Sequence, residues 1–262
     1  MASPKRDELL STWRQEESGQ PQGWDFSALE GRMTESDPPW DYEAHLRQRL
    51  REATTVLDMG TGGGEFLLRF VDDIPADTTA TEGWEPNVAV ARANLADHGV
   101  EVVTFGQPDD SAEPSPMPFA DGRFDLVCNR HESYHPDELF RVLRPGGYFL
   151  TQQVDGTEFS EVRQVLNHPS GAPHATYRNH RKQLLGAGFE VLDGAEFTGY
   201  YEFNDVAALI AYLQLVPWDV PEDFSVDAYA DALLTLHEQG HARGGTVRAS
   251  KIRYWLLARK PR

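Results

Sequence analysis

The sequence predicts an α/β fold, a doubly wound sheet of mostly parallel strands with helices on its faces. Three observations support this prediction. An apolar strand runs into a glycine-rich turn within residues 56–65. A second strand and a helix follow within residues 79–97, and further strands alternate with helices and chain breaks up to residue 151. Repeated β–α–β units of this kind close right-handed into one sheet.

Residues 1–52 precede the first strand and contain several aromatic side chains. A helix is predicted over about 42–51, because Leu46 and Leu50 align on one face. The aromatic content indicates a segment that folds over the ligand-binding edge of the sheet. An equally weighted interpretation is that these side chains close one end of the core. We therefore divide the chain into an N-terminal segment, 1–52, and a domain, 53–262.

The glycine-rich turn carries the strongest functional signal. Gly60, Gly62 and Gly64 alternate after the apolar strand, and a helical stretch follows them. This arrangement presents free helix N-terminal amides to a ligand above the sheet. Glu65 takes the place of the third glycine in a dinucleotide loop, and the lysine of a phosphate loop is missing. Asp58, just ahead of the first glycine, suits a cation such as the α-ammonium of a methionyl group. The turn therefore predicts a nucleoside site.

The second strand ends in acidic residues about twenty residues beyond the glycines. An acid at the tip of this strand is placed to accept hydrogen bonds from a ribose diol. We assign this role to Glu85, which stands beside Pro86 at the predicted strand end, and interpret Glu82 as solvent-facing. A helix is predicted over 87–97, and Gly99 stands where it stops.

Later segments continue the alternation of strands and helices. Apolar runs, glycine stops and the break at 145–147 define them. The remaining predicted elements are a strand over 124–128, a helix ending at Leu143, a strand over 148–151, a helix over 174–188, a strand over 189–192, helices over 205–215 and 225–239, and a closing strand over 247–258. The last two helices form an insertion, at about 205–240, that would cover a small-molecule pocket. Trp218, between two prolines, is interpreted as a wall of that pocket or as a core anchor.

Residues 129–135 follow the fourth strand of the predicted sheet and are dense in acid–base groups. Open α/β sheets bind ligands at the carboxyl ends of their strands. His131 is therefore the candidate general base, with a reference pKa near neutrality, and pocket lining is the alternative. His135 is interpreted as capping or packing against the next helix, and His174 and His180 as helix surface. The sequence shows no cluster of side chains with the spacing of a metal site.

Four blocks of the chain resemble the successive blocks of class I S-adenosylmethionine (SAM)-dependent methyltransferases. The nearest branch contains quinone-biosynthesis and other small-molecule methyltransferases. The blocks are residues 56–65, 83–87, 119–127 and 141–149, within a region of similarity over about 53–155. The resemblance implies a Rossmann-like, seven-stranded sheet with an antiparallel last strand. It also implies SAM as the cofactor and S-adenosylhomocysteine (SAH) as its product.

The resemblance further implies the cofactor contacts. Asp58 and the glycine turn would hold the methionine end, Glu85 the ribose, and an acid near the third strand the adenine. The region 107–118 is longer and richer in proline than the family pattern, so two acids are candidates for the adenine contact. The N-terminal segment is expected to act as a lid whose aromatic faces suit a sulfonium. The predicted cofactor contacts are Asp58, Gly60, Thr61, Gly62, Glu85, Pro86, Asp109, Asp110, Asn129, Trp40 and Tyr42.

The composition of the chain limits which methyl acceptor and which cellular compartment we expect. The net charge of −18 disfavours nucleic acid, whose binding depends on Lys and Arg. A small-molecule acceptor is therefore predicted, ahead of RNA and of a non-catalytic nucleoside-binding role. The single cysteine, Cys128, excludes an internal disulfide and is interpreted as a core residue. The stretch 207–216 is too short and too polar to span a bilayer, and no signal-peptide core follows residues 1–6. We expect a cytoplasmic monomer or homodimer without a metal.

Overall fold

The computed structural model describes residues 4–19, 26–107, 115–242 and 244–262. The chain forms two compact units, each assembled from separate stretches of sequence. One unit comprises residues 1–38, 156–173 and 198–252, and the other comprises residues 39–155, 174–197 and 253–262. The second unit contains the glycine-rich turn and all four blocks on which the family resemblance rests.

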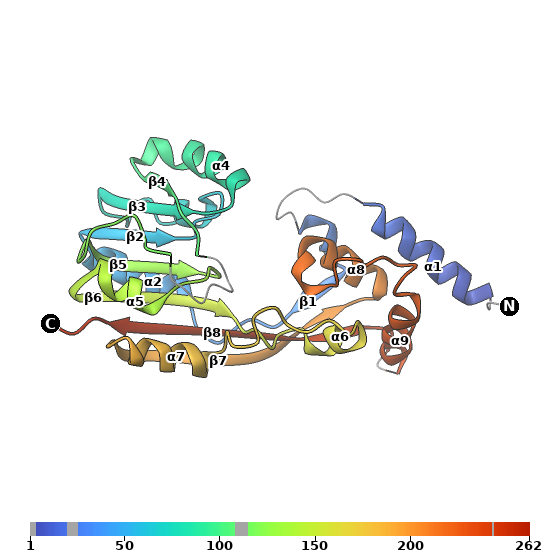
Figure 1. Ribbon diagram of the computed structural model, residues 1–262. Coiled ribbons are helices and arrows are strands. Elements are labelled where there is room, and N and C mark those ends of the chain that lie inside the picture. The colour runs from blue at the N-terminus through green and yellow to red at the C-terminus, as the bar shows by residue number, and fades with distance from the viewer. Residues whose placement is uncertain (1–3, 20–25, 108–114, 243) are drawn as a thin grey trace. The chain divides into compact units, whose positions relative to one another are not determined.

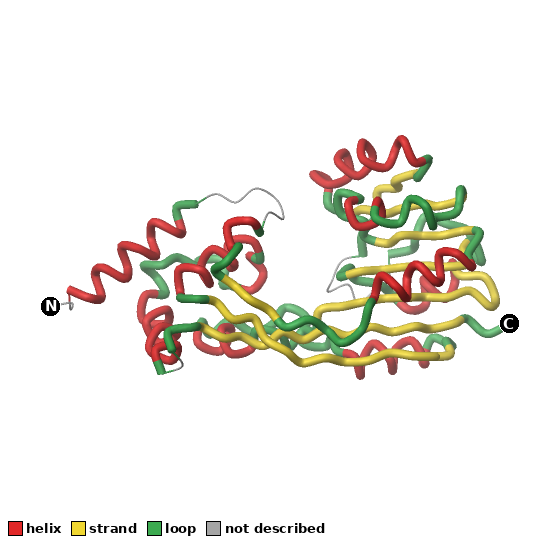
Figure 2. The backbone as a smooth tube through the Cα atoms, turned by 180° about the vertical axis from the view of Figure 1, so that it is seen from behind, coloured by secondary structure: helices red, strands yellow, loops and turns green. Residues whose placement is uncertain are grey.

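The described residues form an eight-stranded sheet with the order β1-β7-β8-β6-β5-β2-β3-β4. The strands, many of them labelled in Figure 1, are β1 (Met33–Glu35), β2 (Thr55–Met59), β3 (Asp77–Glu82), β4 (Glu101–Thr104), β5 (Phe124–Arg130), β6 (Leu143–Val154), β7 (Glu190–Phe203) and β8 (Val247–Arg259). The helices are α1 (Pro4–Glu17), α2 (Tyr42–Glu52), α3 (Glu65–Leu68), α4 (Glu85–Leu95), α5 (Pro136–Val142), α6 (Ser160–Val165), α7 (Tyr177–Gly186), α8 (Val206–Leu215) and α9 (Ala230–His241). Figure 2 shows the same alternation of strands and helices from behind.

The strand directions confirm the predicted α/β class. Strands β2, β3, β4, β5 and β6 pair in parallel, and the last strand, β8, pairs antiparallel with β6. The predicted count of seven strands is too low by one, because β1 adds to β7 in antiparallel pairing. This strand has three residues and no buried side chain, so no alternation of apolar and polar residues predicted it.

Two apolar layers enclose the parallel strands of the second unit. Side chains of α2 pack on one face with Val56, Leu126 and Cys128, which we call the α2 face of the sheet. Helices α5 and α7 cover the opposite face, where Leu57 and Val127 contribute. Successive strand residues point to opposite faces, so residues two apart share a face. Each residue at a strand end therefore lies either on the α2 face or on the opposite face of the sheet.

Several predicted boundaries shift in the structure. The strand predicted over 189–192 continues to Phe203, and α9 begins at Ala230 rather than at Ser225. Residues 145–147 lie within β6, where the pairing with β5 becomes irregular instead of breaking. Trp218 is 53% exposed, so the core-anchor interpretation is wrong.

The first unit has its own apolar core. Helix α8 lies within the range of the predicted insertion, and nine of its ten residues are buried. Aromatic side chains of Phe159, Tyr201 and Phe203 pack around Tyr212 of this helix. In the part of the chain that the structure describes, no helix combines the length and the apolar character that crossing a membrane requires.

Candidate functional site

The glycine-rich turn lies at the carboxyl end of β2, as the sequence predicted. Gly60 and Gly62 have positive φ angles of 73° and 63°. A Cβ at Gly60 would lie 2.5 Å from Glu132 side-chain atoms, whereas a Cβ at Gly62 would meet no atom within 4 Å. The N–H of Thr61 donates to the carbonyl of Thr81 at 2.8 Å and fixes the turn against β3. The turn is therefore hydrogen-bonded to β3 and is open at Gly62, which suits the close approach of a ligand.

Asp58 presents a buried carboxylate beside this turn. Its side chain lies on the α2 face, where the thiol of Cys128 is 3.4 Å from Oδ1. Burial raises the pKa of Asp58, and the Thr61 hydroxyl beside it opposes that rise. The Thr61 hydroxyl oxygen is itself buried, and within the described ranges it makes no hydrogen bond of normal geometry. A cationic ligand would favour the ionised form of this carboxylate. Cys128 is buried, as predicted.

The two acids at the end of the second predicted strand lie in the opposite places to those predicted. Glu82 is the last residue of β3, is 7% exposed, and accepts the Trp84 N–H at 2.7 Å. Glu85 and Pro86 are exposed in the first turn of α4. The interpretation of Glu85 as the strand tip and of Glu82 as solvent-facing is therefore wrong. Proline is well tolerated in a first helical turn, and here the helix begins one residue before it.

The tips of β3 and β4 approach closely beside this acid. A Cβ on Gly83 would lie 2.6 Å from the Cα of Gly106, so both positions require glycine. The Oε1 atom of Glu132 is 3.7 Å from where a Cβ on Gly106 would lie. Glu132 thus reaches both the glycine-rich turn and the end of β4. The sequence reasoning missed Glu132, although it lies in the acid–base segment that follows β5.

Asn129 and Tyr42 lie inside the protein rather than on a ligand-facing surface. The Asn129 side chain is fully buried, and its Oδ1 accepts the Thr151 hydroxyl at 2.8 Å. Tyr42 is 6% exposed and donates its hydroxyl to the Asn129 carbonyl at 3.0 Å. The Tyr42 ring stacks on Phe66 with centroids 6.3 Å apart. Both predicted cofactor contacts therefore support the end of β5 from within.

Trp40 is half-buried and is held beside β6 and β7. Its Nε1 donates to Gln152 at 2.9 Å, and its ring meets Phe197 edge-on at 6.2 Å. A contact between Trp40 and the cofactor stays a prediction. The two candidate adenine acids, Asp109 and Asp110, lie outside the described residues.

The loop between β5 and α5 carries the candidate base. His131 is exposed, and its backbone N–H donates to the Gln152 carbonyl at 3.0 Å. Its φ is 61°, a value that is uncommon for a residue other than glycine and that marks a constrained backbone. His135 takes the N-cap position of α5 without a side-chain capping bond. The imidazole of His131 is therefore accessible at the carboxyl edge of the sheet.

The prediction that His180 lies on the helix surface is wrong. The His180 side chain faces inward from α7, and its Nδ1 is 2.7 Å from the Tyr254 hydroxyl. The Tyr134 ring lies 4.9 Å away, and burial lowers the pKa of His180 to about 4. His174 precedes α7 and is exposed.

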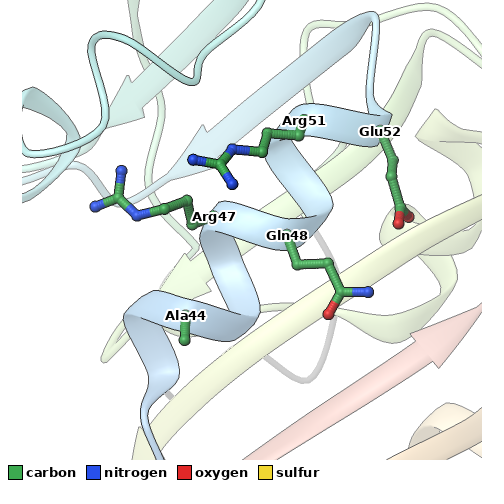
Figure 3. A pocket seen from close by; sticks show the side chains of 5 residues that line it. All are labelled: Ala44, Arg47, Gln48, Arg51 and Glu52. Carbon is green, nitrogen blue, oxygen red and sulfur yellow. The ribbon is translucent and has the colours of Figure 1, made fainter.

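The surface hollow in Figure 3 is lined by residues other than the candidate site residues described above. It lies along α2 between Ala44 and Glu52, and its arginines, Arg47 and Arg51, both pair with Asp73. The two guanidinium groups therefore share one carboxylate. Among the residues with described positions, no three His, Cys, Asp or Glu side chains are grouped to hold a metal ion.

Comparisons with known proteins agree with this geometry. Residues 56–147 match the family described as a methyltransferase domain. The uncharacterized methyltransferase YcgJ of Bacillus subtilis (strain 168) is 30% identical over 120 residues, which cover 43% of this chain and 46% of that protein. A malonyl-[acyl-carrier protein] O-methyltransferase of Enterobacter lignolyticus (strain SCF1) is 30% identical over 145 residues, covering 52% of this chain and 53% of that protein. The chain spans about half the length of these curated relatives.

A solved structure supports the fold. A candidate methyltransferase from Bacillus halodurans C-125 matches with a TM-score of 0.59 at 20% identity, covering 85% of this chain and 99% of the other. Residues 56–147 therefore match a methyltransferase domain, within a chain that has a Rossmann-like α/β fold. The narrower branch suggested by the sequence stays a prediction.

Proposed function

We propose that this protein is a SAM-dependent methyltransferase that acts on a small-molecule acceptor. The observation that carries the proposal is the glycine-rich turn next to the buried Asp58, where Gly60 and Gly62 have positive φ angles and a Cβ at Gly60 would collide with Glu132. A backbone that is open at Gly62, beside a buried carboxylate, fits the amino-acid end of a nucleoside cofactor.

The residues present also fit the rest of the cofactor. We propose that Asp58 holds its ammonium group and that Glu82, at the tip of β3, accepts hydrogen bonds from its ribose. Trp84 is 55% exposed beside Glu82, and its aromatic ring suits contact with the adenine ring of the cofactor. The sequence reasoning did not select Trp84, although a tryptophan in a polar connection between strand and helix was a visible signal.

Bound SAM would supply a methyl group on a positively charged sulfur. The chain's own contribution is to position the acceptor, and positioning contributes about 7–11 kcal/mol in favourable cases. We propose that His131, exposed at the edge of the sheet, takes the acceptor's proton where one must be removed. The net charge of −18 supports a small molecule over RNA as the acceptor. The role of residues 1–52 as a lid stays part of this proposal.

The test measures binding and transfer separately. Purified protein should bind SAH with a Kd of about 1 μM, or about −8 kcal/mol, by calorimetry. Gly60→Val should abolish binding, because the new side chain would collide with Glu132 in a strained backbone. The control is Gly99→Ala, another glycine with positive φ whose Cβ would meet no atom within 4 Å. Transfer of labelled methyl from SAM to candidate metabolites then establishes catalysis. Normal SAH binding by Gly60→Val would disprove the assignment of the turn.

A further inference from the structure

Arg130, the last residue of β5, lies at the same edge of the sheet as Asp58. The register pairs Asp58 with Cys128 on the neighbouring strand. Arg130 is two residues beyond Cys128, so it shares the α2 face and lies about 7 Å further along the strand. The two residues are close enough for the charge of Arg130 to act on the Asp58 carboxylate. A negative and a positive side chain thus occupy neighbouring positions above the start of the glycine-rich turn.

The Arg130 guanidinium is anchored on the helix that follows this turn. Its Cζ lies 4.6 Å from the ring centroid of Phe66, in the first turn of α3. The Arg130 side chain is exposed, so its donors can reach a ligand. Stacking on an aromatic face orients a planar guanidinium and leaves its in-plane N–H groups available.

Arg130 also differs from the other arginines near it. Arg69 lies over the same ring at 5.8 Å, but it forms an ion pair with Glu43 at 2.7 Å. Within the described part of the chain, Arg130 forms no ion pair, although acids outnumber basic residues 42 to 24. Partial burial lowers the pKa of Arg130, and the positive charges of Arg253 and Arg69 lower it further, whereas Tyr42 and Glu43 oppose this effect. An anionic ligand would favour the charged guanidinium.

We propose that Arg130 binds the α-carboxylate of the cofactor's amino-acid end, while Asp58 binds its α-ammonium. An α-amino acid carries both charges on one carbon, and a neighbouring carboxylate and guanidinium match that zwitterion. Arginine forms paired hydrogen bonds with carboxylates, which strengthens such a contact. This inference rests on the proposed function and assigns the receptor for one chemical group of the ligand.

The affinities of three ligands for the 262-residue chain distinguish the role of Arg130 from that of Asp58. SAH carries both charged groups, S-adenosyl-3-thiopropylamine keeps the amine but lacks the carboxylate, and methylthioadenosine lacks both. In calorimetry, Arg130→Gln should weaken SAH about 10- to 100-fold. The same variant should bind the amine ligand and methylthioadenosine within about twofold of the unmodified protein. Asp58→Asn should weaken both ligands that carry the amine.

Arg69→Gln is the matched control, because it removes the other guanidinium near Phe66, and it should leave all three affinities unchanged. Thermal unfolding of each variant shows whether its fold is retained. Equal SAH binding by Arg130→Gln and the unmodified protein, or an equal loss for all three ligands, would overturn the inference. Failure of the unmodified protein to bind SAH would instead overturn the proposed function and the inference with it.

Discussion

At the scale of single residues, the choice between two acids three positions apart decides the ribose contact. Glu82→Gln should weaken SAH binding by about 1.5–3 kcal/mol, because a hydrogen bond to a charged group would be lost. Glu85→Gln should change the affinity little, since this side chain is exposed in the first turn of α4. Calorimetry on both variants measures the difference. A loss confined to Glu85→Gln would restore the sequence-based assignment.

His180 predicts how stability depends on pH. Burial lowers its pKa to about 4 in the folded chain, against about 6.5 when unfolded. Between these values the unfolded chain binds more protons, so stability is fully present above about pH 6.5 and falls as the pH drops toward 4. The loss from this residue should approach about 3 kcal/mol at pH 4.

Urea unfolding of His180→Gln at pH 7 and pH 4.5 tests this prediction. Glutamine keeps a polar partner for Tyr254 but does not titrate, so the fall in unfolding free energy should be smaller than in the unmodified protein. His98→Gln, at an exposed position, is the control. An unchanged pH dependence in His180→Gln would show that other groups cause the loss.

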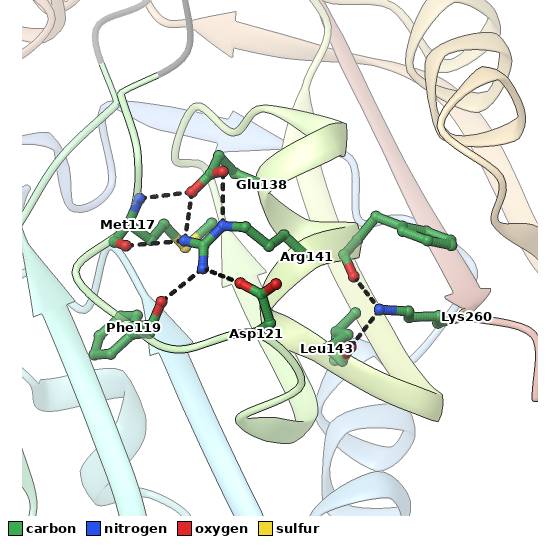
Figure 4. Close-up of polar contacts among 8 residues, drawn as sticks. Met117, Phe119, Asp121, Glu138, Arg141, Leu143 and Lys260 are labelled. Carbon is green, nitrogen blue, oxygen red and sulfur yellow. Dashed lines mark hydrogen bonds and ion pairs between the residues drawn. The ribbon is translucent and has the colours of Figure 1, made fainter.

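At the scale of elements, Arg141 of α5 binds the segment that precedes β5 and holds it against this helix. Figure 4 shows its guanidinium between the Glu138 carboxylate and the backbone carbonyls of Met117 and Phe119, at 2.7, 2.9 and 2.7 Å. It also pairs with Asp121 at 2.9 Å. One side chain therefore satisfies four groups from two elements.

Arg141→Lys should lower the free energy of unfolding by about 1–3 kcal/mol, because a lysine cannot reproduce the planar fork and leaves partly buried acceptors unmatched. The control, Arg123→Gln, breaks the more exposed pair with Asp77 and should cost at most about 1 kcal/mol. Urea unfolding measures both. Equal effects would mean that the contacts of Arg141 behave as an ordinary surface pair.

At the scale of the whole molecule, ligand-linked stability should discriminate between cofactors. SAH at a hundred times its Kd should stabilise the protein by about 2.7 kcal/mol. NAD should not, because Glu65 replaces the third glycine that a dinucleotide loop requires. Thermal unfolding with each ligand makes the comparison. Stabilisation by NAD equal to that by SAH would contradict the spacing argument.

The sequence by itself determined the alternation of strands and helices along the chain, the glycine-rich turn and the buried Cys128, because apolar periodicity and the conformational freedom of glycine act locally. Tertiary structure decided the rest. It placed Glu82 rather than Glu85 at the strand tip, turned His180 inward and added β1 to the sheet. It also brought Arg130 beside Asp58 through the pairing of β2 with β5. Burial and strand pairing join residues far apart in the chain, so no local pattern of residues could reveal them.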